Sequence, residues 1–266
     1  MSTIPLSDSW EIGHPYEQYI GRWSRQIAPK FLSWLNIPVG RRWVDIGCGT
    51  GALAAAILDH CSPRSVTGIE PSQGFLKLAD HHLSDRAQLF SGNAAAIPLE
   101  NGSCDVVVSG LVLNFVPDIA AALTEMIRVS APGGVVSAYV WDYAEGMEVI
   151  KTFWDEAVTL DPSATQLHEG IRFPLCIPTE LSAAFTSAGL YDVAVTPLDL
   201  TAKFADFDDY WQPFLGGQGP APAYVMSLPE GQREALRIKL QQKLQPATDG
   251  SITLGARAWG VRGVTL

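Results

Sequence analysis

The sequence predicts an α/β fold in which helices cover both faces of a doubly wound, mainly parallel sheet, and three observations support this prediction. Short apolar, β-prone runs alternate with segments of helical periodicity along the first half of the chain. The valine-rich run at residues 105–109 is typical of a central parallel strand that is buried on both faces. Three glycines lie in the turn between the first apolar run of the sheet and the next helix. A length of 266 residues suits one such domain with added segments.

The composition limits the class of partner. Lys and Arg number 18 against 28 Asp and Glu, and the resulting net charge of −10 has the wrong sign for binding a nucleic acid backbone. The four cysteines are widely spaced without a C-x-x-C pair, so we predict neither a metal site nor a disulfide framework. The sequence has no secretion-signal pattern and no apolar run long enough for a membrane span. We therefore expect a cytoplasmic protein, a monomer or homodimer, with no nucleic acid or membrane partner.

The segment before the first strand predicts one or two helices. Apolar residues recur at helical spacing over residues 16–35. Pro29 is compatible only with a first helical turn or with a break. We interpret residues 1–40 as N-terminal helices and residues 41–266 as the main domain.

The turn after the first strand has the composition of a cofactor loop. Residues 43–46 predict the strand and residues 52–58 the helix, with the glycines between them. Glycine lets the backbone bend sharply and lets a ligand approach the N–H groups at the helix start. The pattern Gly47-x-Gly49-x-x-Ala52, with Glu70 further on, fits a loose dinucleotide fingerprint.

A longer pattern favours a different cofactor. The string Asp45-x-Gly47-x-Gly49-x-Gly51 resembles the first motif of class I S-adenosylmethionine (SAM) dependent methyltransferases. Asp45 adds a carboxylate that can order the loop and face the ammonium group of the ligand. The third glycine comes one residue earlier than a dinucleotide helix places it. The resemblance covers about residues 16–200 and is strongest over residues 43–134.

This resemblance implies a Rossmann-like sheet of seven strands in the order 3-2-1-4-5-7-6, with the last strand antiparallel. It also implies SAM as cofactor and S-adenosylhomocysteine as product. The N-terminal helices either pack against the sheet or form a lid over the cofactor, in which case Tyr16 or Arg22 meets the carboxylate end of SAM.

The next two strands end in residues suited to an adenosyl group. Residues 66–70 predict a strand that ends in Glu70, whose carboxylate can accept hydrogen bonds from both ribose hydroxyls. Pro71 ends this strand and Ser72 caps a helix in which the adjacent His81 and His82 are interpreted as surface residues.

The third predicted strand, residues 87–91, runs into Asn93-Ala94. In the family that the chain resembles, such a pair meets adenine through a side-chain amide and a backbone N–H. Asn93-Ala94 and the following Ile97-Pro98-Leu99 are similar to the quinone-biosynthesis branch.

The central strand brings further candidates to the same edge of the sheet. Ser109 and Leu111 end this strand, and ligands of doubly wound sheets bind outside the carboxyl ends of the strands. Asn114 either orients the substrate or caps the helix at residues 119–129. Residues 132–134 then predict a turn, and residues 135–141 the fifth strand.

Two insertions depart from the plain fold, at about residues 142–178 and 204–246. A helix capped by Thr179 and a strand near residues 192–197 separate them. The second insertion contains a predicted capping box, Ser227-x-x-Glu230, and precedes a closing strand at residues 252–264. The aromatic residues of the insertions form either an apolar pocket for the methyl acceptor or the core of a small subdomain.

The predicted site joins these positions. The cofactor-binding candidates are Tyr16, Arg22, Asp45, Gly47, Gly49, Thr50, Gly51, Glu70, Pro71, Asn93, Ala94, Ser109 and Leu111. A general base is needed only for some acceptors. The candidates are His14, Asp142, Tyr143 and His168, with His168 favoured because it lies beside Glu169 in the first insertion. We predict His168, Asn114 and Tyr143 as the catalytic positions.

The sequence therefore predicts a SAM-dependent methyltransferase that acts by SN2 transfer on a small, partly hydrophobic metabolite. The cofactor supplies the activated methyl group, so the protein mainly aligns the two partners and excludes water. Two alternatives stay open. One is an NAD(P)-dependent oxidoreductase, and the other is a methyltransferase-like module that binds SAM without transferring the methyl group.

Overall fold

The computed structural model describes residues 21–217 and 219–266. The chain forms two compact units. The first, called the sheet unit here, comprises Trp23–Trp141, Leu175–Leu198 and Ala258–Leu266. The second, called the helical unit, comprises, among the described residues, 21–22, Asp142–Pro174 and Asp199–Arg257. The predicted candidates Tyr16 and His14 lie outside the described residues.

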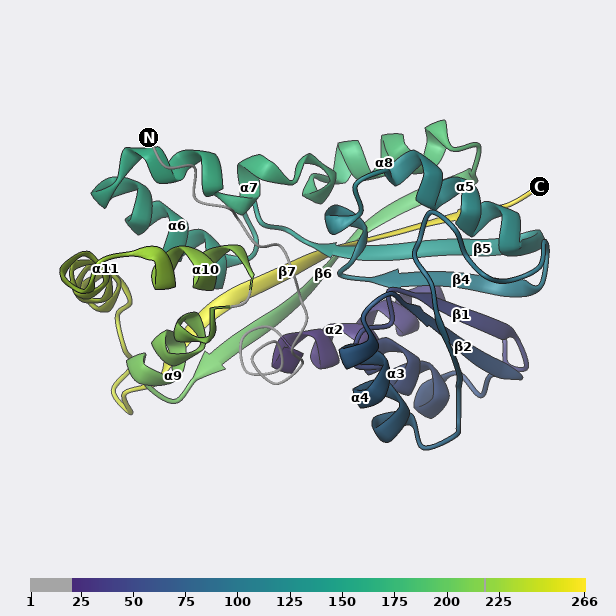
Figure 1. The fold of residues 1–266 in the computed structure, drawn as a ribbon, viewed down its shortest axis with the longest axis horizontal. Coiled ribbons are helices and arrows are strands. Elements are labelled where there is room, and N and C mark those ends of the chain that lie inside the picture. Colours follow the sequence, from purple (N-terminus) through teal and green to yellow (C-terminus); the bar gives the residue numbers. More distant parts are fainter. Residues whose placement is uncertain (1–20, 218) are drawn as a thin grey trace. The chain divides into compact units, whose positions relative to one another are not determined.

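A seven-stranded sheet in the order β3-β2-β1-β4-β5-β7-β6 confirms the predicted fold class (Figure 1). Strands β1 to β5 are parallel, and β7 runs antiparallel to β5. The strands are β1 (Arg42–Ile46), β2 (Ser65–Glu70), β3 (Gln88–Ser91), β4 (Cys104–Gly110), β5 (Ser130–Trp141), β6 (Tyr191–Phe204) and β7 (Ile252–Val264). The unit boundaries fall inside β6 and β7.

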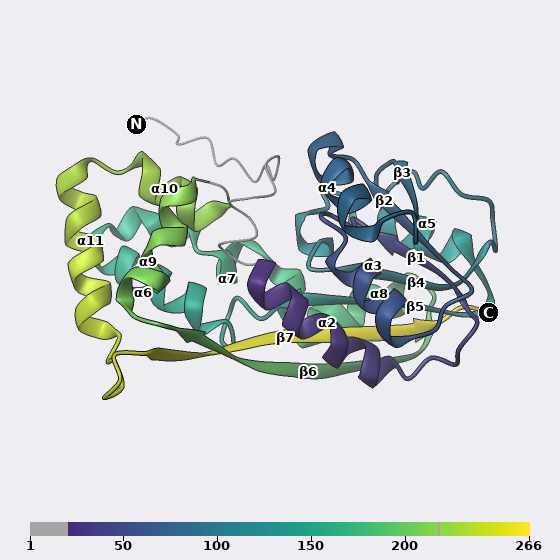
Figure 2. The ribbon, with the colours of Figure 1, turned by 90° about the horizontal axis from the view of Figure 1, so that it is seen from below.

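Helices cover both faces of the sheet (Figures 1 and 2). Helices α2 (Arg22–Leu35), α3 (Ala52–His60) and α4 (Gln73–Leu83) lie on one face, and α5 (Ile119–Val129) and α8 (Pro178–Ser187) lie on the other. Because helices connect the parallel strands, the carboxyl ends of β1, β2 and β4 lie at one edge of the sheet.

The core of the sheet unit follows from the apolar strands. Val106, Val107 and Val108 of β4 are at most 1% exposed, as expected for a strand covered on both faces. On the α2 face, the Phe31 ring lies 4.7 Å from that of Tyr139. Helix α2 thus packs against the sheet through its apolar stripe.

Helix α2 corrects one prediction, because it continues through Pro29 instead of starting or breaking there. Proline cannot donate to the carbonyl four residues earlier. Arg25, which carries that carbonyl, is exposed, so the loss occurs on the solvent side. Ile27 and Phe31 keep their helical spacing across Pro29 and are fully buried, and this packing outweighs the lost bond.

The turn predicted at residues 132–134 is instead a bulge inside β5. Ser130 already pairs with Cys104 of β4, and the ladder resumes with a shift at Val135 and Val106. Gly133 permits this because it has a φ of +71°.

Two predicted helix caps are also wrong. Helix α8 begins with Pro178 at its first position, so Ile177 is its N-cap instead of Thr179. Proline is favoured there because its φ suits a helix and its missing N–H is not needed. Ser227 belongs to the end of α10 (Pro220–Ser227), where its hydroxyl donates to the carbonyl of Tyr224. Helix α11 (Glu230–Lys243) starts separately after Pro229.

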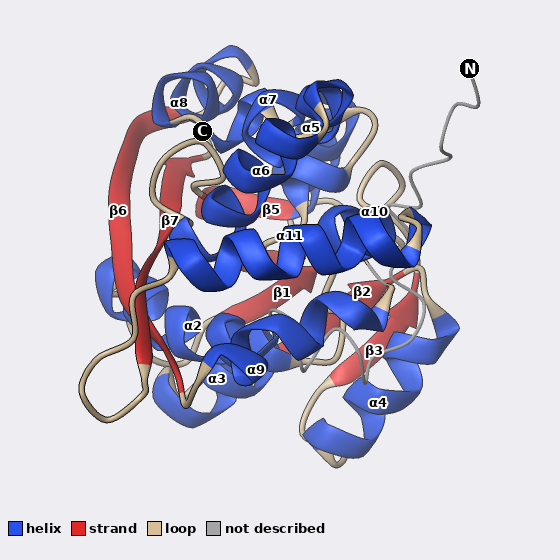
Figure 3. Ribbon diagram, turned by 90° about the vertical axis from the view of Figure 1, so that its left-hand side faces the viewer, coloured by secondary structure: helices blue, strands red, loops and turns tan. Residues whose placement is uncertain are grey.

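The helical unit has an aromatic core of its own, and Figure 3 labels its main helices. Its main helices are α6 (Glu148–Leu160), α7 (Glu169–Arg172), α9 (Phe207–Trp211), α10 and α11. Phe153 stacks on Phe214 with ring centroids 4.6 Å apart, and the Tyr210 hydroxyl donates to the carbonyl of Val149 at 3.0 Å. The residues of this core are at most 3% exposed: Phe153, Trp154, Tyr210, Trp211, Phe214 and Tyr224. The second interpretation of the insertions, a small subdomain core, accounts for these side chains.

Within the described part of the chain, no helix is both long and apolar enough to traverse a lipid bilayer. The same residues contain no group of three or more His, Cys, Asp or Glu side chains able to hold a metal ion.

Candidate functional site

The glycine loop forms a tight turn between β1 and α3. The N–H groups of Gly47 and Cys48 both donate to the Ile69 carbonyl of β2, at 2.7 and 3.1 Å. Gly47 has a φ of +72°, and a Cβ atom there would lie 2.6 Å from the Val112 side chain. Only glycine therefore fits at this position.

The loop is open at Gly49, where an added Cβ would meet no atom within 4 Å. The N–H of Gly49 donates to Oε2 of Glu70 at 3.1 Å, and the N–H of Ser72 donates to Oε1 at 2.9 Å. Each carboxylate oxygen keeps a second lone pair, so both can still accept a hydroxyl proton from a diol.

Glu70 itself is 6% exposed, and burial raises the pKa of its carboxyl although the two N–H groups oppose the shift. Its charge is thus held in place by backbone donors at the end of β2. This is the geometry that the sequence predicts for a ribose-binding acid.

Asp45 lies at the centre of the site in an unusual state. Its side chain is 1% exposed, and neither carboxylate oxygen has a hydrogen-bond partner among the residues that the structure describes. Burial raises the pKa of this carboxyl to about 7, the charge of Glu70 adds to the shift, and the nearby N–H of Ala54 opposes it without hydrogen-bond geometry. A buried carboxylate without a partner is unfavourable until a donor or a cation reaches it. The buried Asp45 carboxylate therefore fits a cationic ligand.

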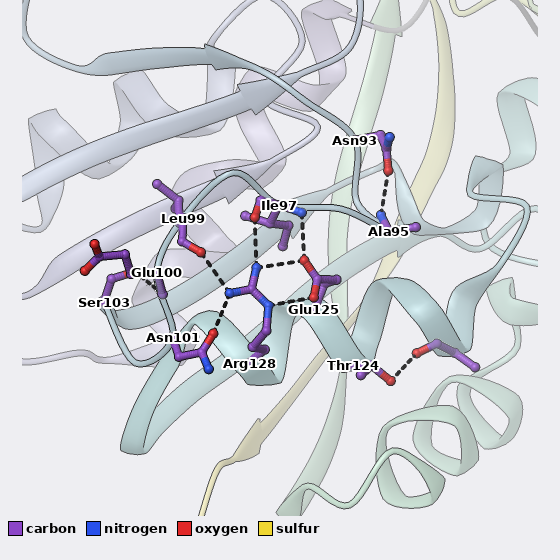
Figure 4. A network of polar contacts seen from close by, with 11 residues as sticks. Asn93, Ala95, Ile97, Leu99, Glu100, Asn101, Ser103, Thr124, Glu125 and Arg128 are labelled. Atoms are coloured by element: carbon purple, nitrogen blue, oxygen red, sulfur yellow. Dashed lines mark hydrogen bonds and ion pairs between the residues drawn. The ribbon is translucent and has the colours of Figure 1, made fainter.

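Asn93 begins the loop after β3, and its Oδ1 accepts the N–H of Ala95 at 2.9 Å (Figure 4). This contact uses the acceptor of the amide and leaves its NH₂ group as a donor on an exposed residue. Purine rings present acceptor nitrogens, so the chemistry fits adenine. Ala94 follows as a half-buried residue.

Two residues of α5 that the sequence analysis did not single out fix this loop (Figure 4). Arg128 donates to the carbonyls of Ile97 and Leu99, each at 2.8 Å, and pairs with Glu125 at 2.6 Å. Glu125 also accepts the N–H of Ile97 at 2.8 Å. The spacing of an acid and an arginine three residues apart on a helix is the signal that was available.

At the end of β4, the site is shaped by a buried side chain and by the backbone conformation. The Ser109 hydroxyl is fully buried and donates to the Ile46 carbonyl at 2.8 Å, which ties β4 to β1. Leu111 has a φ of +61°, and its N–H donates to the Tyr139 carbonyl at 2.8 Å. A left-handed leucine is rare and is often found at functional sites.

Asn114 lies in a short 3-10 turn, Leu113–Phe115. Helix α5 is capped by Asp118, whose carboxylate accepts the N–H of Ala121 at 2.9 Å, so the capping interpretation of Asn114 is wrong. Within residues 21–217 and 219–266, the Asn114 Nδ2 is buried without a hydrogen-bond partner, and so is the indole N–H of Trp141 at the end of β5. Both unused donors belong to the carboxyl ends of neighbouring strands or to the turns after them. Trp141 carried no sequence signal beyond its position.

The sheet unit thus brings most of the predicted cofactor candidates together along adjacent strand ends. Thr50, 4% exposed, lies in the loop, and the exposed Pro71 follows Glu70.

Comparisons with known proteins agree with this geometry. A family model described as a methyltransferase domain matches residues 44–138, which hold the glycine loop, Glu70 and Asn93. The demethylmenaquinone methyltransferase of Geobacillus kaustophilus is 35% identical over 106 residues, which are 38% of this chain and 45% of that protein. The enzyme of the same name from Lactobacillus johnsonii is 29% identical over 191 residues, 65% of this chain and 77% of that protein. The chain is thus similar to class I SAM-dependent methyltransferases over the part that holds the glycine loop.

The chain spans less than half the length of the Geobacillus relative. Among solved structures, it is similar to a putative methyltransferase from an antibiotic biosynthesis pathway of Anabaena variabilis. The TM-score is 0.62 at 20% identity, over 91% of this chain and 97% of that chain, which shows a shared fold. These similarities favour SAM over a nicotinamide for the glycine loop.

The remaining candidates lie in the helical unit. His168 accepts the N–H of Gly170 on Nδ1 at 3.0 Å, which makes it the N-cap of α7. Its Nε2 lies 3.8 Å from Asp155, and burial lowers the pKa of the imidazole. Because Nδ1 accepts this hydrogen bond, it is the unprotonated nitrogen, and Nε2 carries the proton of the neutral ring. The role of His168 as the favoured base stays a prediction, and the residue also caps α7.

Three other candidates of this unit also have structural contacts. Tyr143 is 2% exposed, with its ring 5.8 Å from that of Phe173. Asp142 is 3% exposed and accepts the N–H of Glu145 at 3.0 Å. Arg22 pairs with Asp209 at 2.9 Å and lies 4.6 Å over the Phe204 ring.

Proposed function

We propose that this methyltransferase binds SAM at the strand ends of the sheet unit and transfers its methyl group to a small acceptor. The observation that carries the proposal is Asp45, a fully buried carboxylate without a hydrogen-bond partner, close enough to Glu70 for their charges to interact. An oxidoreductase has no need for a buried acid at this position, whereas SAM carries an ammonium and a sulfonium charge that would compensate it.

Each residue has a defined part in this proposal. Asp45 attracts the cationic end of the cofactor, and Glu70 accepts both ribose hydroxyls. Asn93 donates its amide to the adenine ring, in a loop held by Arg128. The open side of Gly49 leaves room for the cofactor.

When bound, SAM supplies a methyl group on a good leaving group, and the protein has only to orient the acceptor and exclude water. Such alignment is worth roughly 7–11 kcal/mol of the barrier. The donors of Asn114 and Trp141 would bind an oxygen atom of the acceptor, because they are buried and otherwise unused. Where the acceptor must lose a proton, the predicted bases to test are Tyr143 and His168, which must release its Nδ1 cap to accept a proton.

The acceptor class follows from the relatives and from these donors. The two relatives are named for methylating demethylmenaquinone, an oxygen-bearing ring with an apolar tail. We propose a small, partly hydrophobic ring compound that presents an oxygen to Asn114.

The cofactor proposal is tested by calorimetric titration with SAM, S-adenosylhomocysteine and NAD(P). Glu70→Ala and Gly49→Val should each weaken SAM binding at least tenfold while the protein still folds; Gly49→Val also lowers the unfolding midpoint, because Gly49 has a φ of +54°. Glu100→Ala is the matched control, because Glu100 is an exposed acid of the same unit. Unchanged SAM affinity in both site variants, or tight binding of NAD(P) instead, would refute the proposal.

Transfer itself needs a separate test, because a SAM-binding module would pass the titration. Incubation with methyl-labelled SAM and a panel of hydroquinones and phenols, followed by chromatography, should yield a labelled product. Binding of SAM without any labelled product, including from a metabolite extract, would favour the non-transferring module.

We further propose a cytoplasmic protein, monomeric or homodimeric. None of its four cysteines forms a disulfide, as is usual in a reducing compartment. Light scattering coupled to size-exclusion chromatography measures the oligomeric state.

A further inference from the structure

The last turns of α4 form a wall beside the glycine loop. The Nδ1 of His82 lies 3.0 Å from the backbone carbonyl of Thr50, 32 residues earlier in the chain. A carbonyl oxygen only accepts, so Nδ1 must carry the proton and donate it. The imidazole that the sequence suggested to be an ordinary surface group thus contacts the backbone of the cofactor loop.

This contact holds one end of a peptide unit whose other end is held by the loop itself. The carbonyl of Thr50 accepts from His82, and the N–H of Gly51 donates to the Cys48 carbonyl at 2.8 Å. Rotation of the peptide between Thr50 and Gly51 would break both bonds. Gly51 has a φ of +87° and no Cβ, so steric hindrance at Gly51 opposes such a rotation only weakly.

Helix α4 also packs directly against Gly51. A Cβ at this position would lie 3.2 Å from the Leu83 side chain and 3.5 Å from Ala79. Leu83 and Ala79 are at most 1% exposed. The helix thus presents a fixed surface to the loop, and His82 supplies its hydrogen bond to the backbone there.

We propose that His82 is a positioning residue for the cofactor site, which holds the Thr50–Gly51 peptide so that the loop is preformed before SAM arrives. The inference rests on the proposed SAM site in the sheet unit. Without the contact, the loop would have to be ordered by the ligand, and that ordering would be subtracted from the binding free energy.

The test compares three variants by titration with S-adenosylhomocysteine, which is not consumed. His82→Ala should weaken binding by about three- to tenfold, the range expected for one lost hydrogen bond. His82→Asn should restore most of the affinity, because an Asn amide nitrogen occupies nearly the position of Nδ1. His81→Ala is the matched control, since His81 is the exposed preceding residue of α4 and its backbone carbonyl, which the substitution keeps, accepts the Ser84 hydroxyl.

Amide hydrogen exchange in the ligand-free protein gives the second readout. The Gly51 N–H should exchange faster in His82→Ala than in the wild type or in His82→Asn, with unchanged thermal midpoints. If the wild type binds S-adenosylhomocysteine and His82→Ala binds it equally well, or if His81→Ala has the same effect as His82→Ala, this inference is wrong while the SAM site stands. A wild type that binds neither SAM nor its product refutes the proposed function itself.

Discussion

Replacing Asp45 by Asn should make the ligand-free protein more stable and its cofactor binding weaker. The wild-type carboxyl has a pKa of about 7 in the folded protein against an ordinary value of 3.8. The unfolded chain therefore releases this proton at lower pH than the folded chain does. Between these values the folded state binds more protons, so the free energy of unfolding falls as pH rises.

The size of the effect follows from the two values. Their difference corresponds to roughly 4 kcal/mol as an upper bound, at 1.36 kcal/mol for each pH unit. Asn cannot titrate, so the free energy of unfolding of Asp45→Asn relative to wild type should rise by up to this amount between about pH 4 and about pH 8. An unpartnered Asn amide shifts the whole curve by about 1–3 kcal/mol but does not change this slope.

Urea unfolding at a series of pH values measures the difference, and calorimetry measures SAM affinity at the same values. SAM should bind the wild type more tightly as pH rises through about 7, because its positive charges favour the ionised carboxylate. The affinity of Asp45→Asn should be lower and flatter with pH. If both proteins show parallel stability curves and equal affinity, the account of Asp45 given above is wrong.

Three further predictions concern neighbouring parts of the sheet unit. Asp105→Asn should have the opposite effect on stability to Asp45→Asn. The hydrogen bond from Arg42 lowers the pKa of Asp105 to about 2, so this ion pair stabilises the fold at neutral pH. That stability is lost as the pH falls towards 2. Because these side chains are partly exposed and solvent screens the pair, urea unfolding at pH 7 should show that the variant loses about 1 kcal/mol in its free energy of unfolding. An unchanged free energy of unfolding would contradict the reasoning. Gly47→Ala should destabilise the protein by about 2–4 kcal/mol, because the added Cβ would meet Val112. The control Gly40→Ala, with φ +76° but no neighbour within 4 Å, should cost only about 1–2 kcal/mol. Equal losses would show that the contact with Val112 is unimportant. Arg128→Met should loosen the loop after β3, which calorimetry detects as weaker SAM binding and hydrogen exchange detects at Ile97, and unchanged values in both would separate Arg128 from the cofactor site.

The sequence predicted the sheet and its order well because the pattern is local or is carried by the family resemblance. The valine-rich β4, the helix cap at Ser72 and the closing strand β7 lie where the sequence placed them. Its errors arose where packing between distant segments overrides local preference. Pro29 is carried inside α2 by the buried face of that helix, and residues 131–134 bulge from β5 because β4 offers pairing partners on both sides.

The candidate site divides in the same way. The sequence alone was enough to bring Asp45, Glu70 and Asn93 to one edge, because parallel strands that alternate with helices must end on the same side.

Which contacts each side chain makes was decided only in the folded chain. Two bonds, from Ser109 to Ile46 and from His82 to Thr50, join residues far apart in sequence. Packing between distant segments also leaves Asp45 and Asn114 without hydrogen-bond partners among the described residues. Periodicity and motif spacing record which face of an element is buried, whereas hydrogen bonding and desolvation depend on the few ångströms that tertiary packing sets between elements.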